Sequence, residues 1–391
     1  GASACAGVGV EAQADVCEDV VADVAEGVGT IVLNRPEALN ALSGRMCREI
    51  ERHIRAWASP SSGVRLAVVR ASAGGRAFSA GGDVKDCSLD GRAGGEGPDA
   101  QFRAEYELMH WIRASPVPQV AFMDGITMGC GAGLAINGSY RVATERTVFA
   151  MPETSIGFFP DVGANWWLPR VTQPGAGLYV ALTGNRLNAS DLVHLGLATH
   201  YVASARLEAL ENSLRKLNSP QGASDELRVR VELILSEHAS EPDLATSSLR
   251  ANASLLQACF AAPSDVAGIV RALQQSAAAG SDWAAAALGT LRQKSPTSLK
   301  LIHEAMVRGA TMSFDDVLRM EFRLAMAVFK MQVKGPREGD VYEGTRVVLV
   351  DKKGAAQWRP ASLEEVDDAS VLTMFAPPQG GRRELELICM R

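Results

Sequence analysis

Hydrophobic and polar positions divide the chain into two halves of different character. Up to about residue 175, short apolar runs typical of strands alternate with amphipathic stretches of helical spacing. Residues 20–34 alternate around Glu26 and Gly27, which predicts a β-hairpin. We also expect strands at 64–70, 120–123, 140–143 and 148–150, and helices at 42–57, at 102–112 and from Gly129. This alternation predicts an α/β core made of repeating β-β-α units.

The second half reads as mainly helical, although residues 340–351 end in an apolar run typical of a strand. Glycine and acidic residues at 90–99 predict a flexible loop. The expected helices lie at 191–197, 205–217, 224–237, 248–261, 265–279, 282–294 and from Ser295. We therefore divide the chain into a loose tail at 1–19, an α/β core at 20–175, a helical region at 176–375 and a second tail at 376–391.

Composition narrows the classes of function. The 391 residues are 47% hydrophobic and 21% charged, which is typical of a globular protein. A net charge of −6 argues against a broad nucleic-acid surface, and no apolar run approaches the roughly 18 residues of a membrane span. The seven cysteines are dispersed without a C-x-x-C pair, which predicts reduced thiols in the cytosol or an organellar matrix.

Two glycine-rich turns carry the candidate chemistry. One is R-A-F-S-A-G-G-D-V at 76–84, where a backbone free of bulky side chains could leave the Ala80 N–H unpaired; the other is G-I-T-M-G-C-G-A-G-L at 125–134. Taken alone, such a turn is usually only a connection between a strand and a helix. Two carboxylates, Glu153 and Asp161, follow the second turn. Two N–H donors beside an acid or base suggest stabilisation of a developing oxyanion.

These motifs resemble the crotonase superfamily, and within it the 3-hydroxyisobutyryl-CoA hydrolase branch. The resemblance rests on L-N-R-P-E-A-L-N-A-L at 33–42, F-S-A-G-G-D-V, F-R-A-E-Y at 102–106, and above all A-M-P-E-T-S-I-G-F-F-P-D-V-G at 150–163. It implies a spiral of β-β-α units and a helical C-terminal region over the CoA site. It also implies hydrolysis of a short, branched 3-hydroxyacyl-CoA thioester in valine breakdown, in the mitochondrial matrix, by a homo-oligomer without a metal or other cofactor.

The resemblance assigns roles to individual residues. Ala80 and Cys130 correspond to the two oxyanion donors, Glu153 to a nucleophile or general base, and Asp161 to an acid that orients substrate or water. The residues implied in binding are Glu105, Gly129 and Gly131 for the substrate, and Ala38, Leu39, Ala80 and Asp83 for CoA.

Three positions depart from the family pattern or separate its branches. Cys130 replaces a glycine, and a positive φ there would strain the backbone and weaken or abolish activity. Glu37 replaces a lysine near the expected CoA phosphates. Gly133 stands where a hydratase would carry a second glutamate. Relaxed constraint at Cys130 and Glu37 motivates an alternative hypothesis: a non-catalytic subunit of a large ribonucleoprotein assembly such as a mitochondrial ribosome. A hydrolase or isomerase acting on another short acyl-CoA also remains open.

Overall fold

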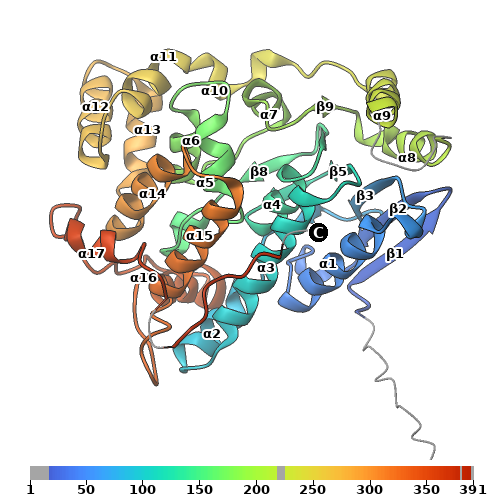
Figure 1. The fold of residues 1–391 in the computed structure, drawn as a ribbon. Coiled ribbons are helices and arrows are strands. Elements are labelled where there is room, and N and C mark those ends of the chain that lie inside the picture. The colour runs from blue at the N-terminus through green and yellow to red at the C-terminus, as the bar shows by residue number, and fades with distance from the viewer. Residues whose placement is uncertain (1–16, 218–224, 379–380, 389–391) are drawn as a thin grey trace, which may run out of the picture.

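The computed structural model describes residues 17–217, 225–378 and 381–388 (Figure 1). The predicted tail at 1–19 therefore lies almost wholly outside the described residues. The strands are β1 (Val20–Ala25), β2 (Val28–Leu33), β3 (Leu66–Ala71), β4 (Ala77–Ser79), β5 (Gln119–Met123), β6 (Ile126–Met128), β7 (Tyr140–Ala143), β8 (Val148–Ala150) and β9 (His200–Tyr201).

Helices of the first half are short except for two. They are α1 (Gly44–Ala58), α2 (Val84–Arg92), α3 (Gly97–Ala114), α4 (Cys130–Ile136), α5 (Ala164–Trp167) and the 3-10 turns η1 (Pro36–Ala38), η2 (Pro60–Ser62), η3 (Glu153–Ile156) and η4 (Leu168–Arg170). Ser43 caps α1 by accepting a hydrogen bond from the Met46 N–H, as Ser-initiated helices commonly do.

The second half is helical apart from β9. It contains α6 (Ala176–Thr183), α7 (Ala189–Leu195), η5 (Ser204–Arg206), α8 (Leu207–Arg215), α9 (Asp225–His238), η6 (Leu244–Thr246), α10 (Ser248–Ala251), α11 (Ala253–Leu256), the π-helical η7 (Gln257–Ala261), α12 (Val266–Ala278), α13 (Asp282–Leu291), α14 (Pro296–Gly309), α15 (Phe314–Val328), α16 (Asp340–Thr345), the π-helical η8 (Arg346–Asp351) and α17 (Asp368–Thr373).

Three successive strand pairs each give one strand to each of two sheets, whereas β1 and β2 both belong to the larger sheet. The larger sheet has the order β1-β2-β3-β5-β7-β9, and the smaller has the order β4-β6-β8. The β1–β2 hairpin is antiparallel, and the other pairings between the described strands are parallel. The pairs β3–β4, β5–β6 and β7–β8 thus repeat one motif along the chain. This confirms the predicted α/β spiral with a helical C-terminal region.

Side-chain alternation places two apolar layers on the larger sheet. Val69 and Met123 face the main core, whereas Val68 and Phe122 pack with the apolar stripes of α8 and α9 on the other face. Figure 1 shows α8 and α9 beside this sheet, while α5, α6 and α10 to α17 gather on the other side of the molecule. The helical half therefore covers both the sheet and the neighbouring core.

Helix α3 spans the space between the core and the helical half. Phe102, Glu105, Tyr106 and Met109 follow helical spacing, and all four are buried. Glu105 and Tyr106 carry polar groups, which are uncommon in a protein interior. This face of α3 therefore brings polar groups into the interior in addition to apolar packing.

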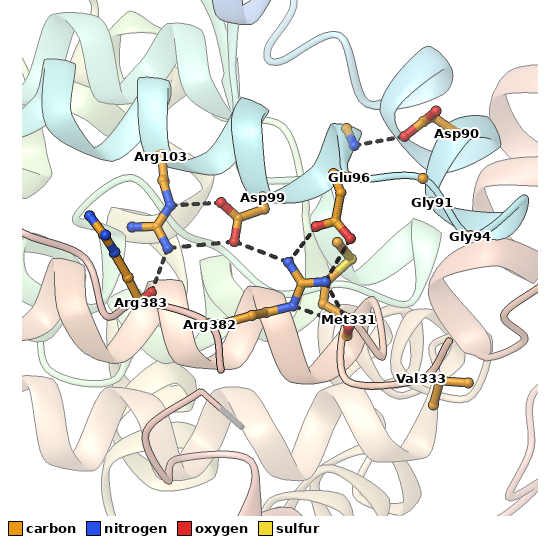
Figure 2. Close-up of polar contacts among 12 residues, drawn as sticks. Asp90, Gly91, Gly94, Glu96, Asp99, Arg103, Met331, Val333, Arg382 and Arg383 are labelled. Carbon is orange, nitrogen blue, oxygen red and sulfur yellow. Dashed lines mark hydrogen bonds and ion pairs between the residues drawn. The ribbon is translucent and has the colours of Figure 1, made fainter. Parts of the chain in front are cut away.

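The C-terminal segment 381–388 fastens to α3 and α15. Figure 2 shows Arg382 and Arg383 beside Glu96, Asp99 and Arg103 at the start of α3. Arg382 pairs with Glu96 and, at 3.4 Å, with Asp99, while Arg103 donates to the Arg383 carbonyl at 2.5 Å. The Arg323 guanidinium donates to Glu384 at 2.7 Å. These contacts join the first turn of α3 to the end of the described chain.

Two sequence predictions were wrong. Residues 90–99 are not a loop throughout, because α2 runs to Arg92 and α3 begins at Gly97. The run at 346–351 is π-helical rather than a strand. It continues α16, whose buried Val341, Tyr342 and Thr345 follow helical spacing, so packing of the preceding turn overrides the strand propensity of the valines.

Candidate active site

The ends of the three strands of the smaller sheet meet at one cavity. β4, β6 and β8 end at Ser79, Met128 and Ala150, and the residues after each strand line a cavity of about 170 Å³. Carboxyl ends of parallel strands lie along one sheet edge, so the topology itself gathers these turns. The lining comprises Ala80, Gly81, Gly82, Val84, Phe102, Glu105, Gly129, Cys130, Pro152, Glu153, Ser155, Ile156, Phe158, Asp161, Val348 and Leu349.

Glu153 is the acid at the centre of this lining. Its side chain is 8% exposed, and its Oε2 atom has no hydrogen-bond partner among the described residues. Burial, and next the charge of Asp161, raise the pKa of Glu153 well above its usual value. A β-carbon at Gly129 would come within 2.8 Å of Glu153 Oε1, so the carboxyl lies directly against this turn. An unpaired, buried carboxyl beside a glycine turn is a group held ready for a ligand.

Asp161 and Glu105 complete a cluster of buried acids. The Tyr106 hydroxyl donates to Asp161 at 2.7 Å, and burial raises the pKa of Asp161 to about 7. Gln101 donates to Glu105 at 2.7 Å, and burial, followed by the charge of Asp161, raises the pKa of Glu105 to about 8. Like charges in one dry site cannot all ionise easily, so the cluster retains protons near neutral pH.

The first predicted oxyanion donor is engaged elsewhere. The Ala80 N–H donates to the Leu39 carbonyl at 2.9 Å, so the expectation of a free amide at this residue was wrong. Gly82 lies two residues later in a parallel bridge to Leu42. The bonds of that bridge use the Gly81 carbonyl and the Asp83 N–H. In such a bridge the Gly82 N–H points away from Leu42, and no described acceptor takes it. Gly82 is therefore the better donor candidate at this turn.

Cys130 does not carry the expected backbone strain. The positive φ of 49° falls on Gly129, and Cys130 begins α4 in a helical conformation. As the first residue of the helix, it has no preceding helical turn to accept its N–H, which leaves this donor at the cavity. A hydrogen bond with Cys47, and next burial, raise the pKa of the Cys130 thiol well above its usual value. The thiol is thus a poor nucleophile, and the backbone amide is the useful group.

Only some of the other predicted binding residues lie at the cavity. Leu39 lies beside Ala80 through the backbone hydrogen bond above, and Asp83 pairs with Arg35 at 2.8 Å. Ala38 precedes Leu39 at the end of η1. Of the four residues expected at CoA, Ala80 lines the cavity, whereas Ala38, Leu39 and Asp83 are not part of its lining. Gly131 does not line the cavity and packs against Ser79 instead. The Glu37 side chain is 73% exposed and lies 4.0 Å from the Arg35 guanidinium.

Glu321 is a buried acid that the sequence analysis did not single out. From α15 it accepts hydrogen bonds from the Gly163 N–H at 2.7 Å and from the Asn165 N–H at 3.1 Å and Nδ2 at 2.9 Å. Burial, and next the charge of Asp161, raise its pKa to about 8. These bonds fix the segment that follows Asp161, in which Val162 has a φ of 54°, a strained value for a β-branched residue. Its only signal in the sequence is that it stands between two apolar residues, Met320 and Phe322.

The helical half also reaches the cavity. Val348 and Leu349, from the π-helical turn that was expected as a strand, form part of the lining. No described helix is long and apolar enough to cross a membrane. Within the described ranges, no group of three or more His, Cys, Asp or Glu side chains is arranged to hold a metal ion. The cavity lining combines backbone donors, three acids, the Ser155 hydroxyl and apolar side chains.

Comparison with known proteins identifies the family. The sequence pattern of the enoyl-CoA hydratase/isomerase family matches residues 28–375. The mitochondrial 3-hydroxyisobutyryl-CoA hydrolase of Gallus gallus is 40% identical over 95% of this chain and 92% of its own length. The Homo sapiens enzyme of the same name is 36% identical over 92% of this chain and 89% of its own length.

Solved structures agree on the fold. A carnitinyl-CoA dehydratase from Mycobacterium thermoresistibile has a TM-score of 0.81 and 34% identity, covering 95% of this chain and 99% of its own. An enoyl-CoA hydratase from Rhodobacter sphaeroides has a TM-score of 0.78 and 31% identity, covering 92% and 98%. The chain belongs to the enoyl-CoA hydratase/isomerase family, the crotonase family of enzymes that act on CoA thioesters.

Proposed function

We propose that this protein hydrolyses a short, branched 3-hydroxyacyl-CoA thioester, with 3-hydroxyisobutyryl-CoA as the substrate. The buried carboxyl of Glu153 carries this proposal, because its Oε2 atom has no hydrogen-bond partner among the described residues and it shares the cavity with Gly82 and Cys130. The relatives named mitochondrial 3-hydroxyisobutyryl-CoA hydrolase support this acyl group and a mitochondrial location. The family resemblance implies that such a reaction belongs to valine breakdown.

The proposed chemistry uses the cavity as follows. The thioester oxygen accepts hydrogen bonds from the N–H groups of Gly82 and Cys130, which stabilise the negative charge that develops during attack. Each such donor is worth about 3 kcal/mol in acyl-transfer enzymes. The Glu153 carboxylate either attacks the carbonyl carbon or removes a proton from an attacking water. The C–S bond then breaks, and the CoA thiolate takes a proton. When water attacks, this step yields the free acid directly. When Glu153 attacks, it leaves an anhydride between Glu153 and the acyl group, which a water molecule then hydrolyses to release the acid and restore Glu153.

The raised pKa values support the acid and base roles. Ionised Glu153 is a stronger base than an ordinary carboxylate because burial disfavours its charge. Asp161, with a pKa of about 7, and Glu105, with a pKa of about 8, each keep a proton in much of the enzyme near neutrality. Either can supply the proton that the leaving thiolate needs.

Hydration of an enoyl-CoA is the competing activity, because the two solved relatives carry the names of a dehydratase and a hydratase. Hydration by two glutamates would require the second one at position 133. A β-carbon at Gly133 would lie 2.6 Å from Val162 Cγ2, so this position has no room for a side chain. The cavity and its acids also speak against a purely structural subunit.

Product analysis separates these activities. Purified protein is incubated with 3-hydroxyisobutyryl-CoA and with the corresponding 2,3-unsaturated thioester, and the products are resolved by mass spectrometry. We expect free CoA and the hydroxy acid from the first, without interconversion of the two thioesters. Interconversion without release of CoA would refute hydrolysis and favour hydration.

A further inference from the structure

A serine–lysine pair at the cavity wall has no part in the chemistry above. Ser155 lies two residues after Glu153 in η3 and lines the cavity. Lys294, in the connection between α13 and α14, donates from Nζ to Ser155 Oγ at 2.7 Å. The pair joins the α/β core to the helical half at the substrate site.

Lys294 is a half-buried cation without an acidic partner. Among the residues that the structure places, no carboxylate forms an ion pair with it. Burial lowers the pKa of the Lys294 amine, and no charge is among the causes of this shift. The cavity lining itself contains three acids but no Lys, Arg or His. Lys294 therefore brings a positive charge to a wall otherwise made of acids and apolar groups.

The hydrogen bond determines what Ser155 can offer a ligand. A serine hydroxyl has one donor and two acceptor positions, and the ammonium occupies one acceptor position. The Ser155 O–H has no acceptor among the described residues. A hydroxyl whose oxygen accepts from a cation is polarised, and its proton becomes a stronger donor. Ser155 can thus donate to an oxygen atom of a molecule bound in the cavity.

The position of Ser155 relative to Glu153 indicates which oxygen atom of the substrate accepts this hydrogen bond. Residues in a 3-10 turn rise by about 2 Å each, so Ser155 lies about 4 Å beyond Glu153 along the turn. Both residues line the cavity, so with Glu153 at the thioester carbonyl in the proposed reaction, Ser155 lies near the carbon atoms that adjoin that carbonyl. Ile156 and Phe158 offer those carbons only apolar contact. We propose that Ser155, held and polarised by Lys294, donates a hydrogen bond to the oxygen on carbon 3 of the acyl group and so selects 3-hydroxylated substrates.

This inference rests on the proposed function, and its test compares two thioesters that differ only in that oxygen. We would measure kcat/KM for 3-hydroxyisobutyryl-CoA and isobutyryl-CoA with the wild type, Ser155→Ala and Lys294→Met. Lys300→Met is the matched control, because Lys300 pairs with Asp368 away from the cavity. Loss of one such hydrogen bond is expected to lower kcat/KM about tenfold for the hydroxylated thioester in both variants. The value for isobutyryl-CoA should change less than about twofold, and the control should match the wild type.

Two other results would contradict the proposal that Ser155 selects 3-hydroxylated substrates. An equal loss on both thioesters would assign Ser155 to the pantetheine arm or to the fold, and no loss on either would remove it from the site. Failure of the wild type to hydrolyse both thioesters would instead refute the proposed function. In that case, isothermal titration would measure the affinity of the wild type and of Ser155→Ala for each thioester. The proposed role of Ser155 requires that Ser155→Ala weaken binding of the hydroxylated thioester only.

Discussion

The Glu153 carboxyl lies against the α-carbon of Gly129, so the turn that precedes α4 and the proposed reactive acid fit only in the absence of a side chain at position 129. An alanine β-carbon would come 2.8 Å from Glu153 Oε1, at a residue whose φ is 49°. We expect Gly129→Ala to reduce kcat at least about a hundredfold, because it displaces the acid and the adjoining N–H donor together.

Gly129→Ala could also lower kcat through backbone strain alone, so the test needs a control glycine that has a positive φ but no contact with Glu153. Gly74 also has a positive φ, of 77°, but a β-carbon there would meet nothing within 4 Å. Gly74→Ala is therefore the control, with wild-type kcat expected despite a similar backbone cost. Equal kcat in the two variants would show that the contact with Glu153 is unimportant.

Position 133 separates hydrolysis from hydration. A side chain at Gly133 would collide with Val162, which already has a strained φ and whose carbonyl accepts from Asn137 at 2.9 Å. Gly133→Glu should destabilise the fold by about 3 kcal/mol or more and should not produce hydratase activity. Gly289→Glu is the control, since no atom lies within 4 Å of a β-carbon there. Denaturant titration of both variants measures the difference, and a stable Gly133→Glu enzyme that hydrates enoyl-CoA would contradict the account.

Buried acids predict how stability depends on pH. The folded protein raises the pKa of Asp161 from 3.8 to about 7, and those of Glu105 and Glu321 from 4.5 to about 8. Between these limits the folded chain binds more protons than the unfolded chain. The free energy of unfolding should therefore be highest near the unfolded pKa values and fall as the pH rises through 7 and 8.

Glu321→Gln tests one member of this group. The amide cannot ionise but can still accept one of the hydrogen bonds from Gly163 and Asn165. We expect a loss of about 1–3 kcal/mol at low pH and a shallower decline toward high pH. Urea unfolding between about pH 5 and 9 measures both. A slope equal to that of the wild type would mean that Glu321 ionises as freely in the fold as in water.

Cys130 should be compatible with activity. Its φ is not positive, and its proposed contribution is a backbone N–H that any residue except proline supplies. Cys130→Gly should keep kcat within about threefold of the wild type. It should destabilise the fold by about 1 kcal/mol, because the contact with Cys47 is lost and a glycine enters a helix. A large gain in kcat would instead revive the interpretation that the cysteine obstructs the oxyanion site.

The sequence predicted the fold well where local pattern and tertiary structure agree. The hairpin around Glu26, the strand at 140–143 and the Ser43 cap depend on turn residues, alternation and capping, all of which are local. The valine-rich run at 346–351 became helical because α16 continues through it, and only the packing of that helix reveals this.

The site residues also differ in whether local sequence motifs reveal them. The turns, Glu153 and Asp161 lie in dense motifs, so the sequence could place them together. Ala80 and Gly82 are both small residues of one turn, and only the bridge to Leu42 shows which amide is free. Glu321 and Lys294 come from the helical half, more than 130 residues beyond Glu153, so no spacing in the sequence connects them to the cavity.

The most direct test of the account is release of free CoA from 3-hydroxyisobutyryl-CoA by the wild type and Glu153→Gln. Glu241→Gln, a change at an exposed acid, controls for the loss of one negative charge. We expect rapid release by the wild type and the control, and a reduction of at least about a thousandfold in Glu153→Gln. Undiminished release by Glu153→Gln, or no release by the wild type, would refute hydrolysis through Glu153.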